Sequence, residues 1–342
     1  MIYQNKLADK LPILFMLMGL PASGKSAVAE KLCVGSNDKI QFPAPLATRP
    51  IPAIKVTHPV IHSSDNLRKE LYGDERNQEH NGELFNELHK RIKEDLRNGK
   101  DVIYDATNIS KKRRMAFIQE LKNIPCYKVC VAVMTPYELC LKQNSSRERK
   151  VPDHVICRMY LNWNPPSYDE GFNDILIDYH YESDDDIDKY TLENFFTGEI
   201  GADFINQENS HHTYTIGNHC RIAGEYLKEH YPDDSILHTA GLMHDIGKVF
   251  TKSPLNSKGE IDGDHHYYQH HCVGAYDSFF YTDAMELLKF DKLRIANLIY
   301  YHMMPFTAWK QSPKLEQRHR TQIGDRMYSD IMKLHEADLA AH

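Results

Sequence analysis

An eight-residue stretch, GLPASGKS at residues 19–26, has the composition and spacing that hold a nucleotide phosphate. It reads G-x-x-x-x-G-K-[ST], the phosphate-binding P-loop. The apolar run 13–18 before it predicts a buried strand, and residues 27–32 after it predict a helix. In this context backbone N–H groups turn towards phosphate at a helix N-terminus. We expect Lys25 to reach the β- and γ-phosphates of ATP and the Ser26 hydroxyl to hold Mg²⁺.

A carboxylate and a basic run could complete a phosphoryl-transfer site. Asp65 follows residues 60–62, which predict a second strand, and ligands of α/β sheets bind at the carboxyl ends of strands. Asp65 could therefore accept the proton of an attacking hydroxyl, or it could simply cap a helix over 67–71. The run Arg147-Glu148-Arg149-Lys150 between two predicted helices suggests a lid whose arginines stabilise the transferring phosphoryl group. The alternative is a solvated basic face.

The second half of the chain offers metal ligands instead. Histidine and aspartate recur at wide spacing in a sequence that reads as helical, at His219, His244, Asp245, His270, His302 and Asp338. Imidazole and carboxylate together suit Mn, Fe, Co, Ni, Zn or Mg as divalent ions. The His-Asp pair follows an apolar helix, where an unpaired polar pair would be costly. His238 and His335 are interpreted as core histidines. The weaker candidates are interpreted as surface residues: His211, His212, His265 and His266.

These groups need two scaffolds. Strands over 13–18, 60–62, 102–105 and 127–133, alternating with helices, predict a parallel sheet flanked by helices. An amphipathic helix over 83–98 has Leu84, Leu88, Ile92 and Leu96 on one face. Four cations begin a helix at residue 111, which indicates a nearby anion or a solvated turn. The proline-rich segment 34–59 predicts an extended surface loop. From about residue 190 the pattern is mainly helical.

Charge divides the 342 residues in the same place. Residues 1–180 carry 26 Lys or Arg and 22 Asp or Glu, whereas residues 181–342 carry 15 and 26 and hold 14 of the 20 histidines. The acidic run at 182–186 predicts an exposed linker. We therefore expect domains at 1–180 and 209–342, joined by a linker at 181–208. No run approaches the ~18 apolar residues of a membrane helix, and residues 1–10 lack a signal-peptide core. Seven cysteines without a C-x-x-C pair favour reduced thiols in a cytoplasm.

The motifs of the first half resemble those of the polynucleotide 5′-hydroxyl kinases of phage and bacterial RNA end repair. The resemblance covers roughly residues 11–178 and is carried by GLPASGKS, SSDNLR, DATNISKKRR and NSSRERKVPDHVICRMY. It implies a P-loop kinase fold with a helical lid, Asp65 as general base on the 5′-OH, and Arg68 as a ligand of the acceptor phosphate. The implied ATP-binding residues are Gly19, Gly24, Lys25, Ser26, Arg147 and Arg149. A family motif beside the site contains Asp105, Thr107 and Asn108. The proline-rich segment departs from the compact family pattern.

The order H…HD…H…H…D, with HDIGK, resembles the HD-domain metal-dependent phosphohydrolases over about residues 209–342. This resemblance implies an all-α domain with His219, His244, Asp245 and Asp338 as metal ligands. It implies that His270 and His302 bind a second metal or the scissile phosphate, and that Lys248 binds the phosphate. The chain departs from the family at Gln269, His271 and His342. A bound metal would lower the pKa of its water and stabilise charge on the departing phosphate.

Together the two halves predict nucleic-acid end healing in a bacterial or phage-infected cell. One half would phosphorylate 5′-OH ends of RNA or DNA with ATP and Mg²⁺. The other, with a divalent transition metal (Mn, Ni, Co, Zn or Fe), would remove 2′,3′-cyclic, 2′- or 3′-phosphates. A separate RNA ligase is the expected partner. The alternatives are a small-metabolite kinase fused to an HD nucleotidase, and a regulatory module whose P-loop senses ATP.

Overall fold

The computed structural model of the chain describes residues 11–34, 58–209 and 213–342, and these residues form two compact units. The first unit runs to Asp153 and resumes at residues 166–180; residues 154–165 and those from 181 onward form the second. Helix α7 (Asp153–Tyr160) thus lies almost wholly in the second unit, as do residues 181–208, which the sequence assigns to a linker. The proline-rich loop lies almost entirely outside the described residues, as do His211 and His212.

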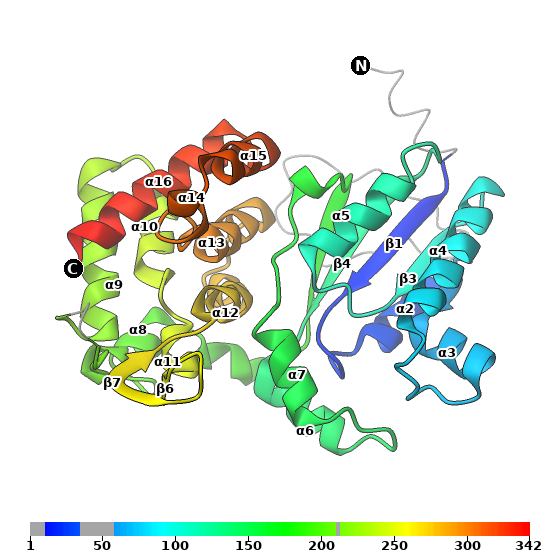
Figure 1. Cartoon of the computed structure of the whole chain (residues 1–342), viewed down its shortest axis with the longest axis horizontal. Helices are drawn as coiled ribbons and strands as arrows, with labels where there is room; N and C mark the ends of the chain where they lie inside the picture. Colours follow the sequence, from blue (N-terminus) through cyan, green and yellow to red (C-terminus); the bar gives the residue numbers. More distant parts are fainter. Residues whose placement is uncertain (1–10, 35–57, 210–212) are drawn as a thin grey trace. The chain divides into compact units, whose positions relative to one another are not determined.

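The first unit is built on a five-stranded parallel sheet in the order β2-β3-β1-β4-β5 (Figure 1). Its strands are β1 (Ile13–Met18), β2 (Val60–Ser63), β3 (Val102–Asp105), β4 (Tyr127–Met134) and β5 (Asp174–Tyr179). Its helices are α2 (Lys25–Val34), α3 (Ser64–Tyr72), α4 (Asn81–Arg97), α5 (Lys111–Glu120), α6 (Tyr137–Ser145) and the short η2 (Tyr168–Glu170). The four predicted strands are confirmed. The fifth, at one edge of the sheet, was missed because Asp174 and Asp178 limit its apolar run to the three residues 175–177.

The core of this unit explains the apolar runs in the sequence. All six residues of β1 are buried, because the strand lies between β3 and β4 with both faces covered. Alternate residues of β1 and β4 pack against α2 on one face: Ile13, Phe15, Leu17, Val129, Val131 and Val133 against Val28, Ala29 and Leu32. Helix α4 buries the predicted apolar stripe.

Two of the four cations in the first turn of α5 pair with anions, whereas Lys112 and Arg113 are exposed. The Arg114 guanidinium donates to both carboxylate oxygens of Glu170, each at 2.7 Å, and neither side chain is exposed. Lys111 lies 2.8 Å from the Asp169 carboxylate. The predicted nearby anion is confirmed, and it comes from η2, 56 residues further along the chain.

The second unit is helical apart from one hairpin, β6 (Ser253–Leu255) with β7 (Ile261–His266). Its long helices are α9 (Ile216–His230), α10 (Ser235–Met243), α12 (His270–Ala284), α13 (Lys289–Tyr301), α15 (Pro313–Ile323) and α16 (Asp325–Ala340). Its short helices are η3 (Asp184–Lys189), α8 (Leu192–Phe196), η4 (Ala202–Phe204), α11 (Lys248–Thr251) and α14 (Ala308–Gln311). Helix α10 contacts α9 and α13, and α12 contacts α13. No helix within the described ranges is long and apolar enough to cross a membrane.

Candidate active sites

The P-loop joins the carboxyl end of β1 to α2, where Lys25 and Ser26 occupy the first helical turn. The Lys25 ammonium donates to the Leu20 carbonyl at 2.6 Å, inside the loop. The Ser26 hydroxyl lies 3.3 Å from an oxygen of Asp105, the last residue of the neighbouring strand β3. A hydroxyl and a carboxylate so placed are the oxygen ligands that P-loop enzymes use for Mg²⁺. The donor set therefore fits the ion.

Burial leaves these charges poorly solvated. It lowers the pKa of Lys25, against the opposing attraction of Asp105, and it raises the pKa of Asp105, against the opposing charge of Lys25. Asp65 and Arg147 also act on Lys25 through their charge. The P-loop, the end of β3, the start of α3 and the residues after α6 thus converge on one site.

Asp65 lies in the first turn of α3, and the alternative that it caps this helix is wrong because Ser63 is the N-cap. One Asp65 oxygen accepts from Arg68 at 2.7 Å, and the other accepts from Arg149 at 2.5 Å. Arg149 also lies 3.4 Å from the Glu75 carboxylate. The Asp65 side chain is 48% exposed, so it is both anchored by arginines and open to an acceptor.

The other residues predicted for the kinase site, Thr107, Asn108 and Arg147, differ in their contacts and burial. Thr107 accepts the Gly19 N–H through its carbonyl, at 3.0 Å. The Asn108 side chain donates to the Leu17 carbonyl at 2.8 Å, which fixes the loop after β3 against the end of β1. Arg147 is exposed. Thr107 and Asn108 thus stabilise the P-loop and the strand before it through these hydrogen bonds.

Sequence reasoning missed His180, which directly follows the carboxyl end of β5 and lies beside the P-loop. Gly24 has a left-handed φ of 91°, and a Cβ there would lie 2.8 Å from His180 Nδ1. The other ring nitrogen, Nε2, lies 2.9 Å from the Asp178 carboxylate. The available signal was its position at the end of the strand-like run DILIDYH.

The second unit gathers four histidines with a shared orientation. The Nδ1 atoms of His219, His244, His270 and His302 lie 2.6–3.1 Å from the backbone carbonyls of Ala341, Gly241, Tyr267 and Ile299. A carbonyl only accepts, so each Nδ1 carries a proton and each ring turns its Nε2 inward, where that atom can hold either a proton or a metal ion. The Nε2 atoms pair at 3.0 Å (His219 with His244) and 3.2 Å (His270 with His302). Two facing Nε2 atoms need a proton or a metal ion between or beside them.

Asp245 joins the two histidine pairs. Its Oδ2 lies 3.3 Å from His219 Nε2 and 3.5 Å from His244 Nε2. Its Oδ1 lies 3.3 Å from His270 Nε2 and 3.5 Å from His302 Nε2. The ligand atoms form two buried groups, His219 with His244 and Asp338, and Asp245 with His270 and His302. This donor set fits two divalent ions that share one carboxylate.

Neighbouring cationic groups hold the two buried carboxylates of this centre ionised. Burial opposes ionisation of Asp245, yet the Lys248 ammonium and the His244 ring hold its pKa well below the usual range. Hydrogen bonds from His219 and His244 likewise overcome burial and hold the pKa of Asp338 well below its usual range. Against the effect of burial, Asp245 and Asp338 raise the pKa of His219 to about 9. A proton and a metal ion therefore compete for the same lone pair.

Close backbone packing brings the two groups together. Gly247, just after the His-Asp pair, is so near α12 that an added Cβ would lie 2.1 Å from the His270 carbonyl oxygen and 2.6 Å from the Gly274 nitrogen. Only glycine fits this contact. The glycine in HDIGK therefore sets the distance between Asp245 and His270.

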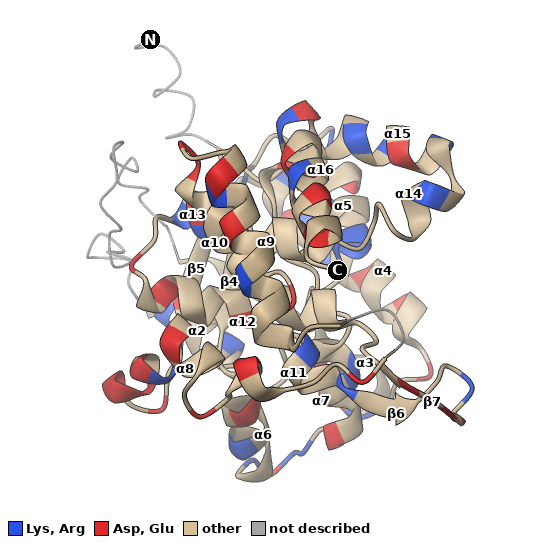
Figure 2. Cartoon of the chain, turned by 90° about the vertical axis from the view of Figure 1, so that its left-hand side faces the viewer, with Lys and Arg blue, Asp and Glu red and all other residues tan. Residues whose placement is uncertain are grey.

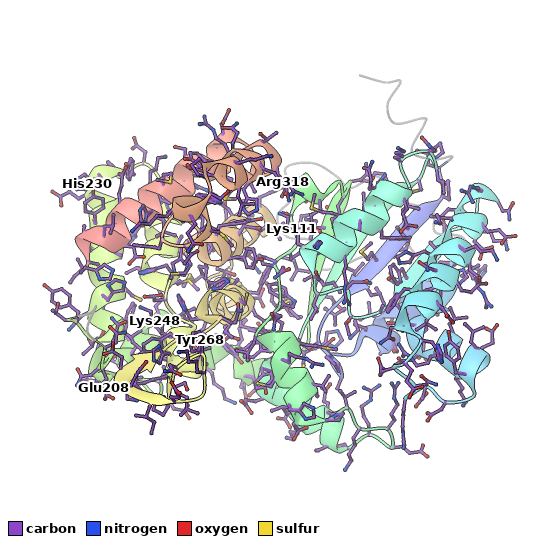
Figure 3. The ribbon with its side chains drawn as sticks, viewed as in Figure 1. Lys111, Glu208, His230, Lys248, Tyr268 and Arg318 are labelled. Carbon is purple, nitrogen blue, oxygen red and sulfur yellow. The ribbon has the colours of Figure 1, made fainter. Side chains whose placement is uncertain are left out.

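Two residues beside Lys248 were missed by sequence reasoning. The Lys248 ammonium donates to Asp245 Oδ2 at 2.6 Å and to the side-chain oxygen of buried Gln207 at 2.8 Å. The Tyr267 ring lies 5.5 Å from the same ammonium, and its hydroxyl donates to the Gln207 backbone carbonyl. Figure 3 shows Lys248 near the β6–β7 hairpin. No sequence motif marks Gln207.

The other histidines lie outside the two groups. His265 and His266 lie on the hairpin beside Glu208 (3.1 Å) and Asp262 (3.0 Å). His342 Nε2 lies 3.6 Å from Asp338 Oδ1. His238 and His335 are half-buried, and burial lowers the pKa of each.

Comparison with known proteins matches both units. Residues 14–166 match the AAA domain family, and residues 209–330 match the HD domain family. The L-seryl-tRNA(Sec) kinase of Methanococcus maripaludis is 30% identical over 168 residues, 48% of this chain and 59% of that protein. Protein kti12 of Schizosaccharomyces pombe is 26% identical over 156 residues, 45% of this chain and 52% of that protein. A gluconokinase of Sinorhizobium meliloti aligns with 51% of this chain and 86% of its own at a TM-score of 0.33 and 13% identity.

The fold and the sites thus define an N-terminal P-loop kinase fold followed by a helical HD domain, which confirms the predicted fold class. The chain covers just over half the length of the two sequence relatives. Neither relative is a polynucleotide kinase by name.

Proposed function

We propose that the chain is a bifunctional RNA end-healing enzyme, which phosphorylates 5′-OH ends and removes phosphate from 2′,3′-cyclic, 2′- or 3′-phosphate ends. The observation that carries the proposal is that one chain holds both a P-loop with a carboxylate anchored by arginines and a buried His–Asp centre bridged by Asp245. One site suits phosphoryl addition and the other suits phosphate removal.

In the kinase unit, Lys25 would neutralise the β- and γ-phosphates of ATP, and Ser26 and Asp105 would hold Mg²⁺, which would balance charge on the transferred group. Asp65 Oδ2 takes the proton of the acceptor hydroxyl. Each Asp65 oxygen accepts from one arginine and keeps a further lone pair, so an acceptor hydroxyl can approach the exposed carboxylate. Arg149 is the partner more easily released, because Arg68 is 5% exposed and lies on the same helix, whereas Arg149 is 23% exposed and lies in the segment after α6. Once released, Arg149 contacts the phosphates of ATP.

In the HD unit, the two ligand groups would hold divalent ions, which would supply an activated water and stabilise charge on the attacked phosphate. Lys248 stands within 2.6 Å of the bridging carboxylate and donates to the scissile phosphate. Gln207 fixes the Lys248 ammonium in that position.

The test is incubation of an RNA with 5′-OH and 2′,3′-cyclic phosphate ends with ATP, Mg²⁺ and each transition metal in turn. We expect a 5′-phosphate and a 2′,3′-diol, which an added RNA ligase then joins. Asp65→Ala should abolish the kinase alone, and Asp245→Asn should abolish end dephosphorylation alone. Loss of both activities in either variant, or of neither, would contradict the two-site proposal.

A second candidate is a kinase acting on a hydroxyl carried by a group attached to tRNA, because one relative is named L-seryl-tRNA(Sec) kinase. Competition distinguishes the acceptors. A 5′-OH oligonucleotide in excess should suppress phosphate transfer to aminoacylated tRNA or small hydroxyl compounds under the first proposal. Suppression in the reverse direction only would favour the second.

A further inference from the structure

The second unit carries a basic surface that the two active sites do not use. We call the basic face the side chains of Lys310 on α14 and of Lys314 and Arg318 on α15. Residues 310–326 contain five Lys or Arg against two Asp or Glu, whereas residues 181–342 contain 15 against 26. All three side chains of the basic face are exposed. Figure 2 shows the blue segments on α14 and α15.

The two nearby acids do not neutralise the basic face. Glu316 accepts the hydroxyl of Tyr328, on α16. Asp325 lies 2.7 Å from Arg320, whose guanidinium also lies over the Tyr328 ring. In the part of the chain that the structure describes, no ion pair involves a member of the basic face. Its positive charge is therefore directed to solvent, and Arg318 extends from α15 (Figure 3).

Contacts among buried and half-buried side chains link the helices of the basic face to the residue before the ligand His302. The buried Trp309 donates its ring N–H to His319 at 3.0 Å, which ties α14 to α15. The His319 ring in turn lies 6.5 Å from the ring of Tyr301, the residue before His302. Since one residue spans at most about 3.5 Å, the eight residues from His302 to Lys310 span at most about 28 Å. A single strand of several nucleotides could bridge that distance.

We propose that the basic face binds the phosphate backbone of the single-stranded RNA whose 3′ end enters the His–Asp centre. The inference rests on the proposed function, and charge complementarity chooses the occupant: an exposed, unneutralised row of cations on an otherwise acidic unit suits a polyanion. Lys314 and Arg318, four residues apart, lie on the same side of α15. Backbone contacts of this kind position a strand without reading its sequence.

The experiment compares the full chain with K310Q/K314Q/R318Q and with a control, K189Q/K228Q/K258Q, which removes three exposed cations elsewhere in the unit. The probe is a fluorescent 12-mer RNA with phosphate at both ends, followed by anisotropy between 0.1 and 1 M salt. Three lost phosphate contacts should reduce the slope of log Kd against log salt by about 2, which is about 100-fold weaker binding at 0.1 M. The control should retain the slope.

A second readout is metal-dependent hydrolysis of p-nitrophenyl phosphate, which needs no backbone contact. The basic-face variant should retain this rate while its KM for the 3′-phosphorylated RNA rises. An unchanged slope, or an equal loss in both triple variants, would overturn the proposal. If the wild type binds RNA with the expected salt slope but dephosphorylates none, the end-healing function fails while the basic face stands as an RNA-binding surface.

Discussion

Replacement of Gly247 by alanine should displace the metal-ligating residues of the HD centre, although it changes none of them. The backbone at this residue is ordinary for alanine, with φ of −69°, so the only new element is the Cβ. That atom would lie 2.1 Å from the His270 carbonyl oxygen, about 1 Å or more inside a normal contact. The obstacle is backbone and cannot rotate away. The turn that carries His244 and Asp245 must therefore separate from α12, which carries His270.

We expect this overpacking to lower the unfolding free energy of the unit by about 1–3 kcal/mol. The corresponding fall in its Tm is about 2–12 °C. A 1 Å shift of one ligand group against the other should lower metal-dependent phosphatase activity by about 100-fold. Kinase activity should remain within about twofold of wild type, because the P-loop unit does not contain the contact.

The assay combines thermal unfolding, metal content by mass spectrometry after desalting, and both enzyme rates on the same preparation. Gly82→Ala is the matched control, since nothing lies within 4 Å of a Cβ there and the residue is helical. The control should equal or slightly exceed wild-type stability. Wild-type metal content and phosphatase activity in Gly247→Ala would refute the claim that this contact sets the geometry of the centre.

Three further predictions concern charge. Because its pKa is raised, protonated His219 should add up to about 3 kcal/mol to the unfolding free energy of the metal-free protein. This contribution is complete below about pH 6.5 and is lost as pH rises through about 9. Urea unfolding of chelator-treated protein should show the decline, and an equally steep decline in His219→Asn would contradict it. Glu170→Gln leaves Arg114 buried without its carboxylate and should lower the unfolding free energy of the kinase unit by about 3–5 kcal/mol in chemical denaturation, whereas a change below 1 kcal/mol would show the pair to be dispensable. Arg149→Lys keeps the charge but cannot contact Asp65 and Glu75 together, so the steady-state kcat of the kinase should fall about 10- to 100-fold. Full kinase activity in this variant would exclude a geometric role for the guanidinium.

Local patterns in the sequence were enough for much of the fold. The run 13–18 is apolar at every position because β1 is buried on both faces, and the stripe on α4 repeats at helical spacing because one side faces the core. Strand β5 was not predicted, because Asp174 and Asp178 limit its apolar run to three residues. The basic turn of α5 could be noticed but not explained, because Glu170 is 56 positions away.

The active sites divide in the same way. The sequence determined the P-loop, since Gly19 to Ser26 act through backbone geometry that eight consecutive residues set by themselves. It also named the histidines and aspartates able to bind a metal, because ligand chemistry belongs to the side-chain type. Only the tertiary structure decided how they combine. Asp245 bridges two histidine pairs, Arg149 meets Asp65, and Gln207 holds Lys248, because helices and strands distant in sequence bring these atoms within 2.5–3.5 Å. Such distances depend on backbone packing, as at Gly247, and no local pattern encodes them.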